Sequence, residues 1–184
     1  MYQYLNKQRG VSLIEALISL VILAIGVLAL AGVQARQLVE TRTANSRAIA
    51  VRLIDDLNER MQLNTEGVRA NNYILGLGAI PGALDCTGAA CTPAQLATFD
   101  LAQWRANVAT LLPNGDAAVF RNPADTRQIG VLLAWSANEG KANSTAALAD
   151  AAYTAPFVVG DAATIAAGAN CPVTAICHLV YLQP

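Results

Sequence analysis

An uninterrupted apolar run near the N-terminus constrains this chain more than any other feature. Residues 11–33 are almost all aliphatic or small, and a transmembrane helix needs about 20 such residues. One acid, Glu15, lies near the start of the run. An acid at the bilayer centre raises the free energy of membrane insertion by roughly 2.5 to 3.5 kcal/mol, and the many Leu, Ile and Val residues offset this cost. The run therefore predicts a membrane helix whose single acid has a partner.

The charges around the run predict its orientation. Lys7 and Arg9 precede it, and no acid lies before Glu15. The positive-inside rule therefore leaves residues 1–10 in the cytoplasm and exports the rest. A secretory signal peptide cleaved after Ala31 is an alternative, although such peptides usually have an apolar region of about 7 to 15 residues without an acid. A plain single-pass anchor is another alternative.

The segment GVSLIE at residues 10–15 resembles the class III signal of type IV prepilins and related pseudopilins. In that family a membrane aspartic peptidase cuts after the glycine on the cytoplasmic side and methylates the new N-terminus. The resemblance implies that prepilin peptidase is a partner, that cleavage falls between Gly10 and Val11, and that Val11 becomes N-methylated. It also implies that Glu15 acts in subunit pairing during assembly. The family most often has Phe at the first mature position, where this chain has Val.

The position of Glu15 agrees with a role in pairing. Cleavage after Gly10 would free an α-amine at Val11, about one helical turn from the carboxylate. An ammonium and a carboxylate that are 4 Å apart attract by about 4 kcal/mol at an effective dielectric constant of 20. Glu15 of an arriving subunit could therefore pair with the first amine of its neighbour and set the axial register. A contact with the chain's own terminus is the alternative.

The helical pattern continues beyond the apolar run. No proline occurs from residue 11 to residue 63, and apolar residues recur mainly at spacings of four, as on one helix face. The arginines and acids of residues 36–60 are interpreted as a solvated face. We therefore predict one helix over residues 11–63, roughly 80 Å long. Residues 11–33 would span the membrane, the second half would pack on a head, and Asn64 would follow the last turn.

Residues 64–184 are long enough for one modest head domain. Thr92 and Pro93 form an N-cap and first-turn pair that predicts a second helix to about residue 112. Strands are predicted at residues 117–121, 128–136, 157–159 and 175–182, with the second one central and the third at an edge, and a long loop at residues 138–155. The expected fold class is α+β and pilin-like, with a long N-terminal helix packed on a small antiparallel sheet.

The four cysteines all follow the apolar run, so the predicted topology exports them to an oxidising compartment. Two local disulfides, Cys86 with Cys91 and Cys171 with Cys177, are the favoured pairing, although four cysteines allow three connectivities. A zinc site is the alternative. The four residues between Cys86 and Cys91 fit the usual C-x₂₋₄-C spacing of zinc knuckles, but the five residues between Cys171 and Cys177 exceed it. We expect no metal and no cofactor.

No catalytic motif is recognisable in the sequence. The single histidine, His178, lies in an apolar stretch beside Cys177, which is more typical of a structural residue than of a general base. The glycines of residues 76–82 lack the Lys-Ser/Thr that a phosphate-binding loop requires. The net charge of −1 becomes more negative when Lys7 and Arg9 are removed, so a nucleic-acid partner is not expected. The chain is not expected to be an enzyme.

Further segments resemble PilV-type minor pilins. These are residues 25–34 and 56–64, the pair Cys86 and Cys91, Trp104, and LPNG at residues 112–115. The resemblance implies a low-abundance pilus subunit that helps prime assembly within a tip complex. Its partners would be other minor pilins and the major pilin, with a large tip adhesin in related systems. The chain would lie in the inner membrane with a periplasmic head before assembly, and in the extracellular pilus afterwards. A type II secretion pseudopilin and an exported soluble protein are the alternatives.

Overall fold

The computed structural model of the protein describes residues 12–136, 157–159, 164–166, 169–172 and 175–184. Its first element is a helix, α1 (Leu13–Leu63), without a break along its length. The chain divides into two compact units at Thr41/Arg42, within α1, so that the part of this helix from Arg42 to Leu63 belongs to the same unit as the rest of the chain. The helix ends at the predicted residue. The predicted start at Val11 lies outside the described residues.

The N-terminal unit consists, over its described residues, of the apolar part of α1. Leu13–Gln34 has a mean hydropathy of 2.8 and is long enough to cross a membrane, and no residue of its most apolar window is buried. A helix that is apolar on every side needs an apolar environment around it. In this chain that environment must be lipid or other protein, because residues 12–34 are exposed throughout.

The C-terminal part of α1 has a different pattern. Here the buried apolar residues lie on one face, at spacings of three and four: Ala50, Leu53, Ile54, Leu57 and Met61. Because i, i+3 and i+4 side chains line one stripe of a helix, this stripe can pack on a core while the opposite face stays polar. The helical periodicity found in the sequence therefore identifies the packed face correctly.

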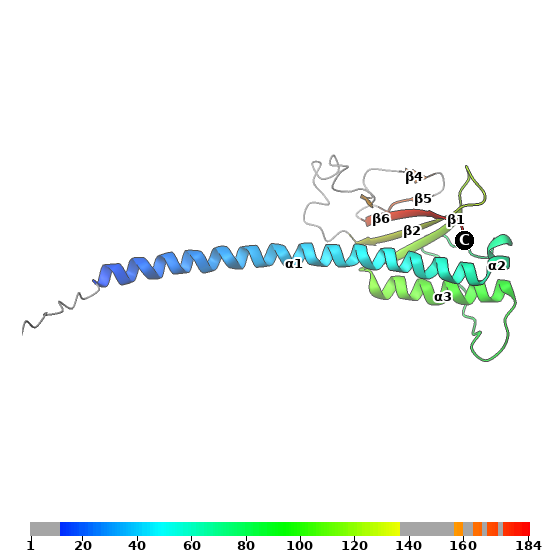
Figure 1. Ribbon diagram of the computed structural model, residues 1–184, viewed down its shortest axis with the longest axis horizontal. Helices are drawn as coiled ribbons and strands as arrows, with labels where there is room; N and C mark the ends of the chain where they lie inside the picture. Colours follow the sequence, from blue (N-terminus) through cyan, green and yellow to red (C-terminus); the bar gives the residue numbers. More distant parts are fainter. Residues whose placement is uncertain (1–11, 137–156, 160–163, 167–168, 173–174) are drawn as a thin grey trace, which may run out of the picture. The chain divides into compact units, whose positions relative to one another are not determined.

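Two further helices accompany the end of α1. The short α2 (Thr65–Arg69) follows directly, with Asn64 as its N-cap, so the predicted stop at Asn64 is correct but a second helix begins there. Helix α3 (Pro93–Leu111) begins after Thr92 with Pro93 in its first turn, as predicted. Figure 1 shows α3 running alongside the C-terminal part of α1.

A four-stranded antiparallel sheet completes the head. Its strand order is β1-β2-β6-β3, with β1 (Asp116–Arg121), β2 (Ile129–Ser136), β3 (Phe157–Val159) and β6 (Ala175–Leu182). The central β2, the edge strand β3 and the last strand are as predicted. Strands β4 (Thr164–Ala166) and β5 (Ala169–Asn170) form a separate pair that the sequence did not reveal. The loop predicted at residues 138–155 lies outside the described residues.

The core lies on both faces of β2, which explains why this strand is apolar without alternation. Val131, Leu133 and Trp135 pack in the larger cluster with residues of α1 and α3. Leu132 and Ala134 pack in a smaller cluster on the other face. Together the elements form an α+β fold in which helices cover one face of an antiparallel sheet, and this confirms the predicted fold class.

Candidate functional site

The first turn of α1 carries the acid that the sequence singles out. The backbone N–H of Glu15 donates to the carbonyl oxygen of Ser12, at 3.0 Å, and to its Oγ, at 3.3 Å. Ser12 therefore acts as an N-cap, and Glu15 occupies the third helical position. A carboxylate in the first turn is stabilised by the positive end of the helix dipole, by about 0.3 to 1 kcal/mol. Ser12 therefore caps the helix, and Glu15 places its carboxylate in the first turn.

Glu15 itself is exposed at the start of the apolar stretch. Its carbonyl oxygen accepts a hydrogen bond from Ser19 Oγ at 2.8 Å, which is a local helix contact. Among the described residues, no basic group forms an ion pair with its carboxylate. Gly10 and Val11, the predicted cleavage and methylation positions, lie outside the described residues, so the roles assigned to them stay predictions.

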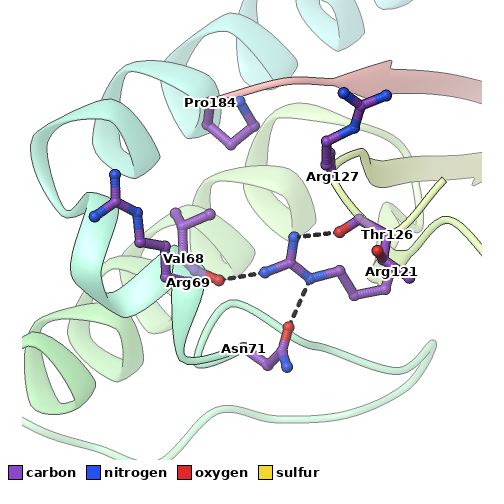
Figure 2. A pocket seen from close by; sticks show the side chains of 7 residues that line it. All are labelled: Val68, Arg69, Asn71, Arg121, Thr126, Arg127 and Pro184. Carbon is purple, nitrogen blue, oxygen red and sulfur yellow. Dashed lines mark hydrogen bonds between the residues drawn. The ribbon is translucent and has the colours of Figure 1, made fainter.

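A groove of about 440 Å³ in the head is lined by three arginines. It lies where the end of α2, the turn between β1 and β2, and the end of the chain come together, as Figure 2 shows. Arg121 forms its floor and donates to Asn71 Oδ1 at 2.6 Å, to the carbonyl oxygen of Thr126 at 2.9 Å and to that of Val68 at 2.5 Å. This groove could not be predicted from sequence, because its residues are up to 116 positions apart. The groove is lined by Val68, Arg69, Asn71, Arg121, Thr126, Arg127 and Pro184.

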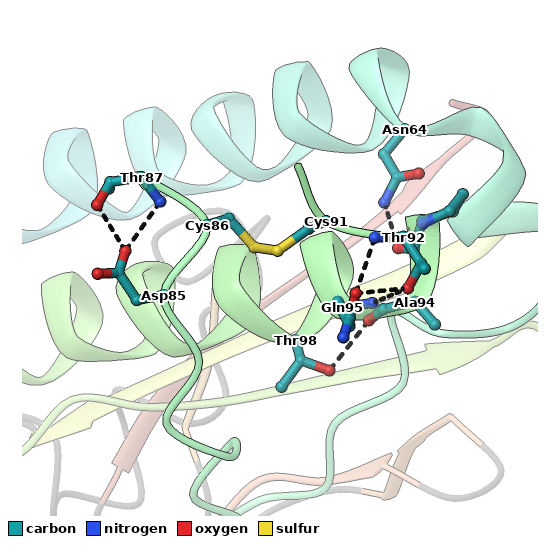
Figure 3. The surroundings of a disulfide bond; sticks show 10 residues. Asn64, Asp85, Cys86, Thr87, Cys91, Thr92, Ala94, Gln95 and Thr98 are labelled. Atoms are coloured by element: carbon teal, nitrogen blue, oxygen red, sulfur yellow. Dashed lines mark hydrogen bonds between the residues drawn. A yellow bond between two sulfur atoms is a disulfide. The ribbon is translucent and has the colours of Figure 1, made fainter. Parts of the chain in front are cut away.

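The first disulfide closes a small loop before α3. Cys86 and Cys91 are joined, with their Cα atoms 5.7 Å apart, and Figure 3 shows this bond next to the N-terminus of α3. Asp85, directly before this loop, accepts hydrogen bonds from the backbone N–H and the hydroxyl of Thr87 within it. These two bonds hold the pKa of the exposed Asp85 carboxyl below its usual value. The disulfide and these hydrogen bonds constrain the loop, which ends one residue before Thr92, the N-cap of α3.

The second disulfide fixes the start of β6. It joins Cys171 to Cys177, the pairing that the sequence favoured, with a Cα–Cα distance of 5.8 Å. His178 follows on the same strand, pairs in register with Leu133 and is 6% exposed. Within the described ranges, no group of three His, Cys, Asp or Glu residues is placed to hold a metal ion. With all four cysteines in disulfides, thiolate ligands for zinc are not available.

A buried polar network joins the three helices, and sequence reasoning missed it. Tyr73 is fully buried, and its hydroxyl donates to Asp100 Oδ2 at 2.5 Å and accepts from Asn64 Nδ2 at 3.2 Å. Asn64 Nδ2 also donates to the carbonyl oxygen of Pro93, and Arg60 pairs with Asp100 at 3.3 Å. Burial, and next the hydrogen bond to Asp100, raise the pKa of Tyr73 well above its ordinary value.

This network corrects one interpretation of the sequence. The charges of residues 36–60 were interpreted as a solvated face, but Arg60 is only 23% exposed in its side chain and connects Asp56 on its own helix to Asp100 on α3. The periodicity of α1 alone could not reveal this, because the partner lies 40 residues further along the chain. The arrangement holds α1 and α3 together through an ion pair and buried hydrogen bonds.

Comparisons with known proteins agree with the N-terminal features. The family model described as the prokaryotic N-terminal methylation motif matches residues 5–31. The family model described as type IV pilin Tt1218 matches residues 32–102. The two matches are adjacent and together cover more than half of the 184 residues. Searches of curated proteins and of solved structures returned no match.

Proposed function

The chain belongs to the type IV pilin family, and we propose that within this family it is a minor pilin that helps prime pilus assembly. The observation that carries this proposal is the methylation-motif match at residues 5–31, which coincides with an exposed apolar helix whose first turn contains Glu15. Members of the family are in general structural proteins. The motif also implies processing by prepilin peptidase and assembly with other pilins.

The finer role is supported by the resemblance to PilV-type minor pilins. The resembling segments include the end of α1 at residues 56–64 and the LPNG at residues 112–115 that ends α3. Both segments lie where helices of the head end. We propose that this head docks on other minor pilins and on the major pilin in a complex at the pilus tip, where a large adhesin is also held in related systems.

The proposed mechanism begins in the inner membrane, with residues 1–10 in the cytoplasm and the head in the periplasm. Prepilin peptidase cuts after Gly10 and methylates Val11. The carboxylate of Glu15 then pairs with the terminal amine of a neighbouring subunit, an attraction of about 4 kcal/mol at 4 Å and an effective dielectric constant of 20. Leaving the bilayer stays favourable because the apolar stretch moves from lipid into a bundle of similar helices.

N-terminal mass spectrometry of the membrane and sheared-pilus fractions tests the processing step. We expect the mature chain to begin with methylated Val11, and the Gly10→Ala variant to retain its leader. A mature chain that begins at Gly32 would indicate an ordinary signal peptide and would refute the proposal. The pseudopilin alternative would be supported by a different result: a mature chain that begins at Val11 in membranes, is found in a type II secretion pseudopilus and is absent from pili.

The Glu15→Ala variant tests the pairing step. We expect normal insertion and cleavage, but at least about tenfold less protein in sheared pili, because losing a pairing of a few kcal/mol changes an equilibrium by an order of magnitude or more. Glu59→Ala is the matched control, since Glu59 is also an exposed acid on α1 but lies outside the apolar stretch. Equal amounts of both variants in pili would contradict the pairing role.

A further inference from the structure

The arginine groove of the head has an excess of positive charge. Arg121 is held by three neutral oxygen atoms, from Asn71, Thr126 and Val68, and it forms no ion pair with any described residue. A guanidinium has five N–H donors, and these three bonds use three of them. The side chain is therefore fixed in place with donors to spare, which is the preorganised state that favours binding of an anion.

Two further arginines stand at the rim. Arg69 is exposed, and its side chain has no hydrogen bond or ion pair within the described part of the chain. Arg127 pairs with Asp125 at 3.1 Å, and its side chain is 84% exposed. The Asp125 carboxylate compensates the charge of one of the three arginines, so the groove keeps an excess of positive charge. Figure 2 shows the three arginine side chains around the hollow, with Pro184 on its upper side.

A structural role explains only part of this arrangement. Arg121 ties the end of α2 to the β1–β2 turn, because it binds the carbonyl oxygens of Val68 and Thr126. A cation at the C-terminal end of a helix is also favoured by the helix dipole. Arg69 contributes nothing to this tie, and Arg127 is held only by its neighbour in the turn. Arg69 is therefore available for a partner, and the exposed guanidinium of Arg127 keeps N–H donors beyond the two that bind Asp125.

We propose that this groove receives a carboxylate side chain from the head of a neighbouring pilin, which is an inference that rests on the proposed function. Planar guanidinium groups match carboxylates in bidentate geometry. The groove is open to solvent and has no aromatic lining residue for stacking on a sugar ring, so it fits a protruding acidic side chain better than an enclosed small molecule. Pilin assembly supplies protein surfaces of this kind.

Photo-crosslinking in cells that assemble pili tests the proposal. The full chain carries p-benzoylphenylalanine in place of Thr126, which is exposed in the groove and whose hydrogen bond with Arg121 uses its backbone carbonyl oxygen. We expect crosslinks in sheared pili to a pilin head, at a peptide that contains Asp or Glu. The Arg69→Glu/Arg127→Glu double variant should lower the yield per incorporated molecule about tenfold, because it removes two attractive pairs and adds repulsion.

A charge swap makes the test specific. Arg52→Glu is the matched control, because Arg52 is exposed on α1 outside the groove and its reversal changes charge in the same way. It should leave the crosslink yield unchanged. Changing the crosslinked acid of the partner pilin to Arg should restore the yield of the double variant. Restoration supports a direct pairing of arginine with carboxylate.

Other outcomes overturn the proposal and separate it from the proposed function. Suppose that the wild-type chain is present in pili but the Arg69→Glu/Arg127→Glu double variant gives the same crosslink yield; the groove then has no such role. The same holds if the crosslinked peptide contains no Asp or Glu, or if the crosslinked protein is not a pilin. The minor-pilin function survives in that case. If the wild-type chain is absent from pili altogether, the proposed function fails, and the inference fails with it.

Discussion

At the scale of single residues, Tyr73 makes a prediction about pH. Burial and the hydrogen bond to Asp100 raise its pKa in the folded head above the value of 10.0 that it has in an unfolded chain. Above pH 10 the unfolded chain therefore loses a proton that the folded head keeps. The free energy of unfolding should fall by about 1.4 kcal/mol per pH unit from this group alone, and the contribution is fully present below pH 10.

The Tyr73→Phe variant isolates this effect, because phenylalanine does not ionise. At about pH 8 the variant should be less stable than the wild type by about 1 kcal/mol or more, since Asp100 loses a hydrogen-bond donor. From about pH 10 to about pH 11 the difference should shrink. Urea unfolding of the detergent-solubilised chain measures both quantities. A stability difference that stays constant over this range would contradict the raised pKa of Tyr73.

The residues that the sequence identified are those whose signal is local. Glu15 stands out because it is the one acid in an apolar stretch, and the cysteines stand out because each has a neighbour five or six positions away. The contact between Tyr73 and Asp100 spans 27 positions, and nothing in the sequence around either residue indicates it. Such a pairing is decided by tertiary packing, which periodicity and motifs do not contain.

At the scale of elements, the start of α3 makes the next prediction. Thr92 and Gln95 form a capping box, in which Gln95 N–H donates to Thr92 Oγ1 and Thr92 N–H donates to Gln95 Oε1. Thr92→Ala should lower the free energy of unfolding by about 1 kcal/mol, because a helix N–H loses its acceptor. Thermal or urea unfolding of the head measures this difference.

Thr110→Ala is the control, because Thr110 is an exposed threonine of the same helix, whose hydroxyl donates to the carbonyl oxygen of Ala106. Alanine is a better helix former than threonine by a few tenths of a kcal/mol, so this variant should be as stable as the wild type or slightly more stable. If both variants had the same decrease in the free energy of unfolding, the decrease would come from replacing any threonine of this helix region and not from losing the N-cap.

The elements that could be predicted are the long or strongly marked ones. Helix α1 follows from its apolar spacing, α3 from its capping pair, and β2 from its continuous apolar run. The short elements were missed. Helix α2 has five residues, one of them Gly67, and β5 has two. Segments this short are held by their surroundings and not by intrinsic propensity, so a single sequence contains little trace of them.

At the scale of the whole molecule, the unit boundary lies inside a helix. The sequence predicts a head domain over residues 64–184, with the second half of α1 packed on it. The compact unit begins at Arg42 and includes this half, because the stripe from Ala50 to Met61 is buried in the head core. The stretch of α1 between the apolar run and Ala50 has no buried residue among those described. A helix without packing contacts opens locally far more often than the core does.

Limited trypsin digestion tests this division of the chain. In detergent, the first cut should fall after Arg42, which is exposed on the unpacked stretch, and should leave a stable fragment that begins at Thr43. Arg60 should resist, because Asp56 and Asp100 hold it in the helix junction. In sheared pili the bond after Arg42 should become protected, because neighbouring subunits would then cover α1. A first cut after Arg60, or equally fast cleavage after Arg42 in both preparations, would contradict this account of the packed and unpacked parts of α1.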